Sequence, residues 1–446
     1  MASLSPRYLW GMTVDSAAII IDLGLERGEP PTYRSPSRST VPAWFPPAVL
    51  AVLVLLCTTA SAAPVKPPLS AIFSLQVGPA DAYALTEGGQ LLAQTFGSLT
   101  SYDLGTGRMR WQTGQSAPTY RLRTDSGLVL MRPYTIGAGD PGTTAISVAT
   151  GVARWRRAGM VVTVAGSATL LAVTNVRSLS GPGRRVQGEV EAIDPLSGGT
   201  RWSIEVPSTA VMVGVPGPAD DGARMLLMHA DHTAAVHDLD TGRLLASAQL
   251  PDADYGPQNP MVAGGLILLR HPGQLGTEIS AYDPATLKQL WSEPARGAYA
   301  IAACGELACV TGPNGIRAVD PATGDQRWAR PGWQSIDQHG TMFIAYGEPD
   351  ATDPLGVVDP DTGNVLVQLD GWRPVGGTGS ADHLLVTRAV DAGARTMVAV
   401  AHLGDARPRL IAELPAGTGD CQAVPTRLVC RSMYGQLVVW AYRAKG

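Results

Sequence analysis

Few residues of this chain stand close enough together in the sequence to suggest a metal site. Three of the seven histidines, His229, His232 and His237, lie near one another and near Asp238. Imidazole nitrogens are common ligands of zinc and related metals. His229 and His232 flank an expected turn, however, and His237 lies on the strand that follows. This arrangement favours solvated or hydrogen-bonded histidines, and we predict no metal site here.

Two acidic stretches look like calcium-binding loops at first sight. Asp220-Asp221-Gly222 lacks the ligand spacing of such a loop, and residues 359–364 (DPDTGN) lack its distal glutamate. The sequence also contains no phosphate-binding glycine loop, no Gly-x-Ser-x-Gly nucleophile and no protein-kinase signature. We therefore predict no catalytic residue and no bound cofactor.

Four of the five cysteines form two close pairs, Cys304 with Cys309 and Cys421 with Cys430. Each pair flanks an expected strand turn, and two cysteines that face each other across a tight hairpin can meet disulfide distances. An exported domain would permit both bonds. We predict two disulfides, with free buried thiols as the alternative. Neither pair has the Cys-x-x-Cys spacing of a zinc or redox motif.

The charge of the chain gives no case for nucleic acid as a partner. The 446 residues carry a formal net charge of −4, and only 16% of them are charged. Positive charge gathers locally at Arg154, Arg156, Arg157, Arg184 and Arg185. These arginines form either a solvated surface or a site for an anionic partner, such as a cell-wall polymer or a membrane surface.

A recurring turn positions most of the aspartates. From Ala71 onward, short apolar or alternating runs are separated by Gly, Pro and Asp turns, which indicates an all-β chain. The pattern Ala-x-Asp-x-x-Thr-Gly-x-x-x-Trp returns with a period of about 40–45 residues. Its best-kept positions are Asp103, Gly107, Trp111, Gly151, Trp155, Asp194, Trp202, Asp238, Gly242, Asp283, Trp291, Asp320, Gly324, Trp328, Asp359 and Gly363.

Each residue type in this pattern has a structural use. The aspartate accepts hydrogen bonds from backbone N–H groups of its own turn. The glycine adopts a backbone conformation that other residues avoid, and the tryptophan suits the space between two packed sheets. The tryptophan is replaced at Ala246, Val367 and Leu410. We expect relaxed packing at these three positions and a binding surface near them.

A repeat of this length with four short strands is typical of a β-propeller blade. We predict eight four-stranded blades, with seven to nine allowed. Residues 421–442 supply three strands, and the chain then lacks the fourth strand of that blade. The isolated strand at residues 70–77 is expected to complete this last blade and to close the ring, because only a closed ring leaves no terminal blade exposed.

The amino-terminal part carries a different signal. Residues 46–63 contain no charged residue, and Arg34 and Arg38 precede them. This pattern predicts a transmembrane or signal-anchor helix with a cytoplasmic amino terminus and an extracellular propeller. A cleaved signal peptide is the alternative, because Ala60-Ser61-Ala62 resembles a signal-peptidase site.

The predicted organisation therefore has four parts. Residues 1–43 form a largely disordered cytoplasmic leader, and residues 46–63 form the helix. Residues 64–69 form a linker, and residues 70–443 form the propeller. The expected location is the cell membrane, with a single span.

The repeat resembles the pyrroloquinoline-quinone (PQQ) repeat of quinoprotein dehydrogenases, which non-enzymatic PQQ-like propellers also use. The resemblance covers residues 70–443, and the layout resembles membrane-anchored PQQ-like proteins of high-GC bacteria. Because the motif residues hold blades together, the resemblance specifies the fold more than an activity. The enzymes of this type imply a calcium-bound PQQ, a catalytic aspartate and often a disulfide between adjacent cysteines, and this chain has no adjacent cysteine pair.

We therefore predict a membrane-anchored extracytoplasmic scaffold that binds a protein or ligand of the cell envelope, without enzymatic activity. A PQQ-dependent quinoprotein oxidoreductase is one alternative. A transmembrane sensor that signals through the leader is another.

Overall fold

The computed structural model describes most of the chain in two compact units, Met1–Lys66 and Pro67–Gly446. The described residues are 42, 44–59, 67–115, 119, 121–133, 141–164, 167–174, 187–207, 209–217, 222–253, 259–274, 276–347, 353–377, 382–391 and 394–444. The predicted leader at 1–43 lies outside these ranges except for residue 42. The predicted linker at 64–69 is described only from residue 67 onward.

The described part of the first unit contains one helix, α1 (Phe45–Thr59). Prolines 46 and 47 stand in its first turn, where the missing N–H groups have no intrahelical partner to lose. The helix carries no acidic residue in its first turn and no basic residue in its last turn. It spans 15 residues, and no helix among the described residues has the length and apolarity to cross a membrane.

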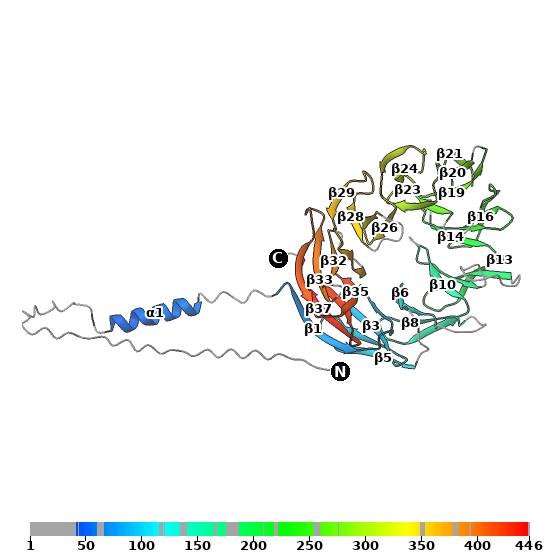
Figure 1. Ribbon diagram of the computed structural model, residues 1–446. Helices are drawn as coiled ribbons and strands as arrows, with labels where there is room; N and C mark the ends of the chain where they lie inside the picture. Colours follow the sequence, from blue (N-terminus) through cyan, green and yellow to red (C-terminus); the bar gives the residue numbers. More distant parts are fainter. Residues whose placement is uncertain are drawn as a thin grey trace, which may run out of the picture. The chain divides into compact units, whose positions relative to one another are not determined.

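The second unit consists of β-sheets, and the first four sheets follow the chain in order (Figure 1). The first sheet contains β2 (Tyr83–Leu85), β3 (Gln90–Thr95), β4 (Ser98–Asp103) and β5 (Met109–Gln115). The second contains β6 (Arg123–Asp125), β7 (Leu128–Met131), β8 (Thr143–Ser147) and β9 (Ala153–Arg157). The third contains β10 (Met160–Thr163), β11 (Leu170–Thr174), β12 (Gln187–Ile193) and β13 (Thr200–Pro207). The fourth contains β14 (Val211–Val215), β15 (Arg224–Met228), β16 (Thr233–Asp238) and β17 (Leu244–Gln249).

The next four sheets repeat this arrangement. The fifth contains β18 (Met261–Ala263), β19 (Leu266–Gly273), β20 (Gly276–Tyr282) and β21 (Gln289–Pro294). The sixth contains β22 (Ala300–Cys304), β23 (Leu307–Gly312), β24 (Gly315–Val319) and β25 (Gln326–Arg330). The seventh contains β26 (Ser335–His339), β27 (Met342–Tyr346), β28 (Pro354–Val358) and β29 (Val365–Gln368). The eighth contains β30 (Arg373–Pro374), β32 (His383–Val390), β33 (Arg395–His402) and β34 (Arg409–Leu414).

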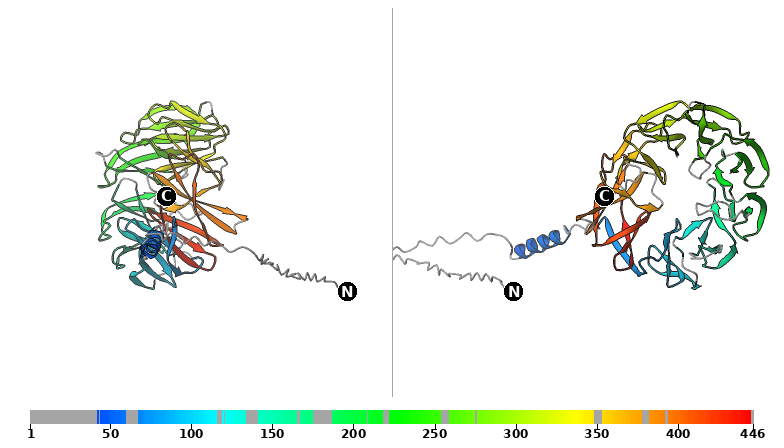
Figure 2. Two further views of the ribbon diagram at one scale, coloured as in Figure 1. Left: turned by 90° about the vertical axis from the view of Figure 1, so that its left-hand side faces the viewer. Right: turned by 45° about the vertical axis from the view of Figure 1, so that its right-hand side comes forward.

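The ninth sheet joins the two ends of the unit. It contains β35 (Thr418–Val424), β36 (Arg427–Ser432) and β37 (Gln436–Tyr442), with β1 (Leu69–Gln76) at one edge and β31 (Gly376–Gly377) in parallel at the other. Figure 2 shows the sheets of this unit following one another around a ring. The all-β propeller predicted from the sequence is confirmed.

The number of sheets corrects the prediction of eight blades, because the described residues form nine. The eighth repeat carries His402 in place of the turn aspartate and Leu410 in place of the tryptophan. Residues 373–414 nevertheless form a complete four-stranded sheet, since strand pairing and core burial do not require the turn motif.

The predicted closure by the amino-terminal strand is confirmed. β1 pairs antiparallel with β37 from Leu69↔Tyr442 to Gln76↔Gln436. The backbone N–H of Val77 then donates to the carbonyl of Gly435 at 2.7 Å. Val77 also packs in one buried cluster with residues of the first and the ninth sheets. The strand therefore completes the ninth sheet and joins it to the first.

Neighbouring sheets dock through the repeat tryptophans. Trp328 of the sixth sheet donates its indole N–H to the carbonyl of Pro360 at 2.8 Å, and its ring lies against Gly363 in the turn of the seventh sheet. The same bond and the same glycine contact recur at the other four positions. The pairs are Trp111 with Val148 and Gly151, Trp155 with Pro195 and Gly198, Trp202 with Leu239 and Gly242, and Trp291 with Pro321 and Gly324.

At the closure of the ring, Phe73 of β1 takes the place of the tryptophan. A Cβ added to Gly107 of the first sheet would lie 2.7 Å from Cγ of Phe73. The amino-terminal strand thus contributes the docking aromatic residue as well as the hydrogen bonds of the missing fourth strand.

Both predicted disulfides form, between Cys304 and Cys309 and between Cys421 and Cys430. Each bond joins two adjacent strands of one sheet, β22 with β23 and β35 with β36. One bond therefore links β22 to β23 in the sixth sheet, and the other links β35 to β36 in the ninth sheet.

The docking glycines give a first prediction. Gly363 and Gly332 both have positive φ, of 65° and 81°, but a Cβ added to Gly363 would lie 2.7 Å from Trp328, whereas a Cβ added to Gly332 meets nothing within 4 Å. Gly332→Ala should cost about 1–2 kcal/mol through its backbone conformation alone. Gly363→Ala should cost a further ~1–3 kcal/mol, because the ring must also move. Urea unfolding of both variants measures the difference, and equal losses would contradict the docking role.

The closing aromatic residue gives a second prediction. Phe73 packs on Gly107, whereas the side chain of Phe96 is 88% exposed. Phe73→Ala should lower the free energy of unfolding by about 2–4 kcal/mol, somewhat below the cost for a fully buried phenylalanine. Phe96→Ala is the matched control and should stay within about 0.5 kcal/mol of the wild type. A Phe73→Ala protein as stable as the control would show that β1 does not hold the ring closed.

Candidate functional site

The carboxylates of the repeat are engaged inside their own turns. Oδ1 of Asp103 accepts from the N–H groups of Gly105 and Thr106, and Arg110 donates to Oδ2. The hydrogen bond from Arg110, together with those from Thr106, lowers the pKa of the Asp103 carboxyl to about 2. At Asp194, the N–H of Ser197 and then the guanidinium of Arg201 lower the pKa to about 2. These groups stay ionised because they hold turns together, which does not suit them to proton transfer near neutral pH.

Two of the three histidines that the sequence brings together have separate partners in the structure. Nδ1 of His237 lies 3.0 Å from the carbonyl oxygen of Gly242, in its own turn. Nε2 of His232 lies 3.3 Å from the carboxylate of Asp252. The acidic stretch at 220–222 is described only at Gly222.

The arginines noted in the sequence have mostly structural contacts. Arg157 donates to the carbonyl of Gly198 at 2.7 Å and to the hydroxyl of Thr200 at 2.7 Å, so it ties the second sheet to the third. Arg156 donates to the carbonyl of Pro141. Arg184 and Arg185 lie outside the described residues.

The positions where the tryptophan is replaced do not share the relaxed packing that we expected. Val367 is buried, and Ala246 packs against a cluster that contains Leu287. Leu287 replaces the docking glycine in the next sheet and is 4% exposed at a φ of 54°. The leucine thus fills the volume that a tryptophan would occupy. Leu410 alone of the three has an exposed side chain, at 52%.

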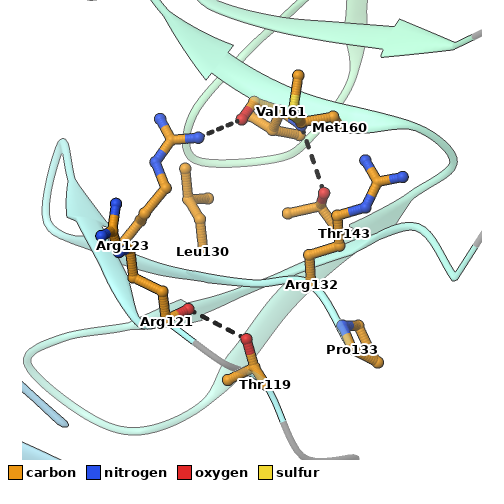
Figure 3. Close-up of a pocket in the computed structure, with 9 residues that line it drawn as sticks. All are labelled: Thr119, Arg121, Arg123, Leu130, Arg132, Pro133, Thr143, Met160 and Val161. Carbon is orange, nitrogen blue, oxygen red and sulfur yellow. Dashed lines mark hydrogen bonds between the residues drawn. The ribbon is translucent and has the colours of Figure 1, made fainter. Parts of the chain in front are cut away.

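Positive charge gathers instead around a pocket between the second and third sheets. The pocket has a volume of about 330 Å³ and is lined by Thr119, Arg121, Arg123, Leu130, Arg132, Pro133, Thr143, Met160 and Val161. We call it the arginine pocket. Figure 3 shows the guanidinium groups of Arg121 and Arg123 on one side of it and that of Arg132 on the other.

The strands place these side chains for simple reasons. Arg123 begins the short strand β6, and Arg121 lies two residues before it. Arg132 follows β7, which pairs with β6. Met160 and Val161 belong to β10, the first strand of the next sheet.

Hydrogen bonds across the pocket hold its two walls together. Arg123 donates to the carbonyl of Val161 at 2.9 Å. The hydroxyl of Thr143 donates to the carbonyl of Gly159 at 2.9 Å and accepts from the N–H of Val161 at 3.3 Å. Thr119 donates to the carbonyl of Arg121. The walls of the second and third sheets are therefore fixed relative to each other before any ligand binds.

The chemistry of this lining favours an anion. Among the described residues, the charged side chains of the lining are those of Arg121, Arg123 and Arg132, which bring three guanidinium groups together. Guanidinium groups bind carboxylates and phosphates through paired, charge-assisted hydrogen bonds. Leu130 and Met160 add apolar contact area beside the charge. A lining with these charged and apolar groups can bind and orient an acidic group.

Sequence reasoning did not single out Arg121, Arg123 or Arg132. They stand outside the repeat motif, and the strand that carries Arg123 has three residues. The alternation of Arg121 and Arg123 was the available signal. Arg132 joins them only through the pairing of β6 with β7, and β10 completes the site from the next repeat.

The sequence matches a known protein family. The profile of the family described as outer membrane protein assembly factor BamB matches residues 60–211 and 186–338. The chain belongs to this family. A comparison with curated proteins finds no match.

Solved structures share the propeller fold with this family member. BamB from Moraxella catarrhalis is 14% identical, with a TM-score of 0.39, and the match covers 84% of this chain and 100% of that one. Quinohemoprotein alcohol dehydrogenase from Comamonas testosteroni is 13% identical, with a TM-score of 0.40 and coverage of 85% and 77%. A eukaryotic initiation factor is 11% identical, with a TM-score of 0.49 and coverage of 81% and 92%. At these identities the likeness concerns the fold alone.

Proposed function

We propose that this family member is a binding scaffold of the cell envelope, and that its arginine pocket receives an acidic group of a protein partner. The observation that carries the proposal is the gathering of three guanidinium groups among the described residues that line the pocket. Positive charge held between two fixed walls favours an anion that docks from outside.

Two observations favour a protein as the partner, namely the exposed arginines at the pocket and the description of the family. The two arginines that flank the mouth, Arg121 and Arg132, have exposed side chains, so a carboxylate on a partner's surface can reach them. The family description names an assembly factor for outer membrane proteins. We propose an analogous role here, in which the chain holds another envelope protein through surface contacts.

The pocket does not fit the calcium-bound quinone of the quinoprotein enzymes. Calcium takes oxygen ligands, chiefly carboxylates. The lining of the arginine pocket offers two threonine hydroxyls and three cationic side chains. We therefore propose no oxidoreductase reaction at this site, and we propose that the protein acts without catalysis.

The proposed location combines the amino-terminal segment with the disulfides. Residues 46–63 are free of charge and follow Arg34 and Arg38, which supports a membrane anchor with a cytoplasmic leader. The two disulfides support a propeller outside the cytoplasm, because such bonds persist in oxidising compartments. In this arrangement the leader and the propeller lie on opposite sides of the membrane. The leader would then allow binding at the propeller to be signalled to the cytoplasm.

Reversing charge at the pocket tests the proposed binding site. A fluorescein-labelled oligoglutamate peptide serves as a probe for carboxylate binding to the purified propeller. Fluorescence anisotropy should show saturable binding that weakens with salt, and Arg121→Glu with Arg132→Glu should weaken it by about tenfold or more per arginine. Arg123 is left unchanged, because its guanidinium group also donates to the backbone carbonyl of Val161.

The matched control is Arg327→Glu, which reverses an exposed arginine on β25 of the sixth sheet. It makes the same change in net charge as either pocket substitution alone, far along the ring, and should leave binding unchanged. In native membranes, a photo-crosslinking residue at Met160 should give adducts that depend on Arg121 and Arg132 in the same way. Equal binding by the pocket variants and by the control would overturn the proposed site.

Fractionation tests the anchor separately. The full chain should remain with membranes after alkaline carbonate washing, because an apolar helix resists extraction that removes peripheral proteins. A chain that starts at residue 67 behind a cleavable export signal should be released. Intact mass measurement of the membrane-bound protein is the accompanying check. A mature protein that begins just after Ala62 would contradict the anchor and favour the cleaved signal peptide.

A further inference from the structure

The eighth sheet brings together three residues that can ligate a metal, and we infer that Asp382, His383 and His402 form a site for a divalent metal such as zinc. One ligand atom from each residue lies within 4.8 Å of the ligand atoms of the other two. His383 begins β32 and His402 ends β33. The two histidines face each other directly as cross-strand partners.

This pair replaces the turn chemistry of the other repeats. His402 stands where Asp103 and Asp238 bind the N–H groups of their own turns. The strand partners of those aspartates are Gln90 and Arg224, neither of which is a metal ligand in proteins as a rule. In the eighth sheet both members of the pair are imidazoles, and the backbone N–H of Asp405 closes the turn by donating to the backbone carbonyl of His402.

The hydrogen bonds of His383 leave one nitrogen without a partner. Nδ1 lies 2.7 Å from Oδ1 of Asp382 and therefore donates to that carboxylate. Nε2 is buried and has no hydrogen-bond partner among the described residues. The side chain as a whole is 12% exposed. A buried acceptor without a partner is costly, and a metal ion would use its lone pair.

The second histidine faces the same space. The rings of His383 and His402 have centroids 5.4 Å apart. Nε2 of His402 lies 3.0 Å from the carbonyl oxygen of Ala444, so it donates there and leaves the lone pair on Nδ1. Both imidazoles are thus held by one nitrogen and offer the other, as metal-binding histidines commonly are.

The ligand set selects the class of metal. Two imidazoles, one of them oriented by a carboxylate, suit zinc or a similar transition metal, whose remaining coordination positions water can fill. Calcium and magnesium prefer oxygen ligands, so they fit this set poorly. Asp382 is 62% exposed, and its carboxylate accepts from Nδ1 of His383, so it orients the imidazole whose Nε2 meets the metal.

The position of the site gives the metal a structural use. Ala444 follows β37, the strand that pairs with β1 to close the ring. The ring of Tyr442, at the end of β37, also packs edge-on against His383, with centroids 6.3 Å apart. A metal bound by the eighth sheet would rigidify His402 and with it the attachment of the closing strand. The site therefore stabilises ring closure.

Cobalt binding to the full chain at neutral pH tests the site directly. Co²⁺ should bind with one-to-one stoichiometry and give visible absorption bands of a tetrahedral complex, which excess Zn²⁺ removes. His383→Gln, His402→Gln and Asp382→Asn should each weaken binding by about tenfold or more. Zn²⁺ should raise the thermal midpoint of the wild type but not that of His402→Gln, because binding stabilises the folded state by mass action.

His232→Gln is the matched control, because His232 also pairs with an aspartate, Asp252, elsewhere in the ring. It should bind Co²⁺ like the wild type. X-ray absorption at the zinc edge of the wild-type protein avoids reliance on variants that fail to fold, and it should show two imidazole ligands. The inference is overturned by absent one-to-one binding, by binding that survives His402→Gln, or by binding that His232→Gln abolishes.

Discussion

The contact between a tryptophan and a glycine of the next sheet is the constraint on which this ring depends. The indole ring needs a flat space, and the turn provides it because a glycine with positive φ has no Cβ to fill it, as Gly363 does for Trp328. The indole N–H would lose its hydrogen bond to water on burial, and the carbonyl of Pro360 restores it. One contact thus fixes both the distance between sheets and their register, and its repetition fixes the ring.

The interfaces that lack a repeat tryptophan must also fill the space between neighbouring sheets. Ala246 leaves a gap at the fourth sheet, and Leu287 fills it from the fifth, at the position where other repeats have glycine. At the closure, Phe73 supplies an aromatic ring from a strand more than three hundred residues away in sequence from its sheet partners. At each of these two interfaces a large apolar side chain lies at the docking position, although the residue that provides it changes.

Much of this fold could be predicted from the sequence, because the repeat is a local signal with a fixed period. The turn aspartates, the tryptophans and the unpaired strand before the first repeat together specify blades and closure. The count of eight was one too low because it followed the blade numbers typical of propellers, whereas the repeat with His402 and Leu410 forms a sheet of its own without the turn motif. The arginine pocket could not be predicted for a different reason. Arg123 and Val161 belong to successive repeats, and their contact depends on how two sheets dock, which no local pattern encodes.

The regular repeat also limits which positions of this protein can bind a ligand. The carboxylate of Asp103 accepts hydrogen bonds from its own turn. Residues at the regular motif positions therefore have few acceptors available for a ligand. Groups that can bind something must lie where the repeat does not dictate the residue. Arg121 precedes β6 in the sequence, and Arg132 follows β7. His402 occupies the position at which the eighth repeat lacks the turn aspartate. In a propeller with such a regular frame, the departures from the repeat are therefore the positions at which partner and metal recognition can evolve without loosening the ring.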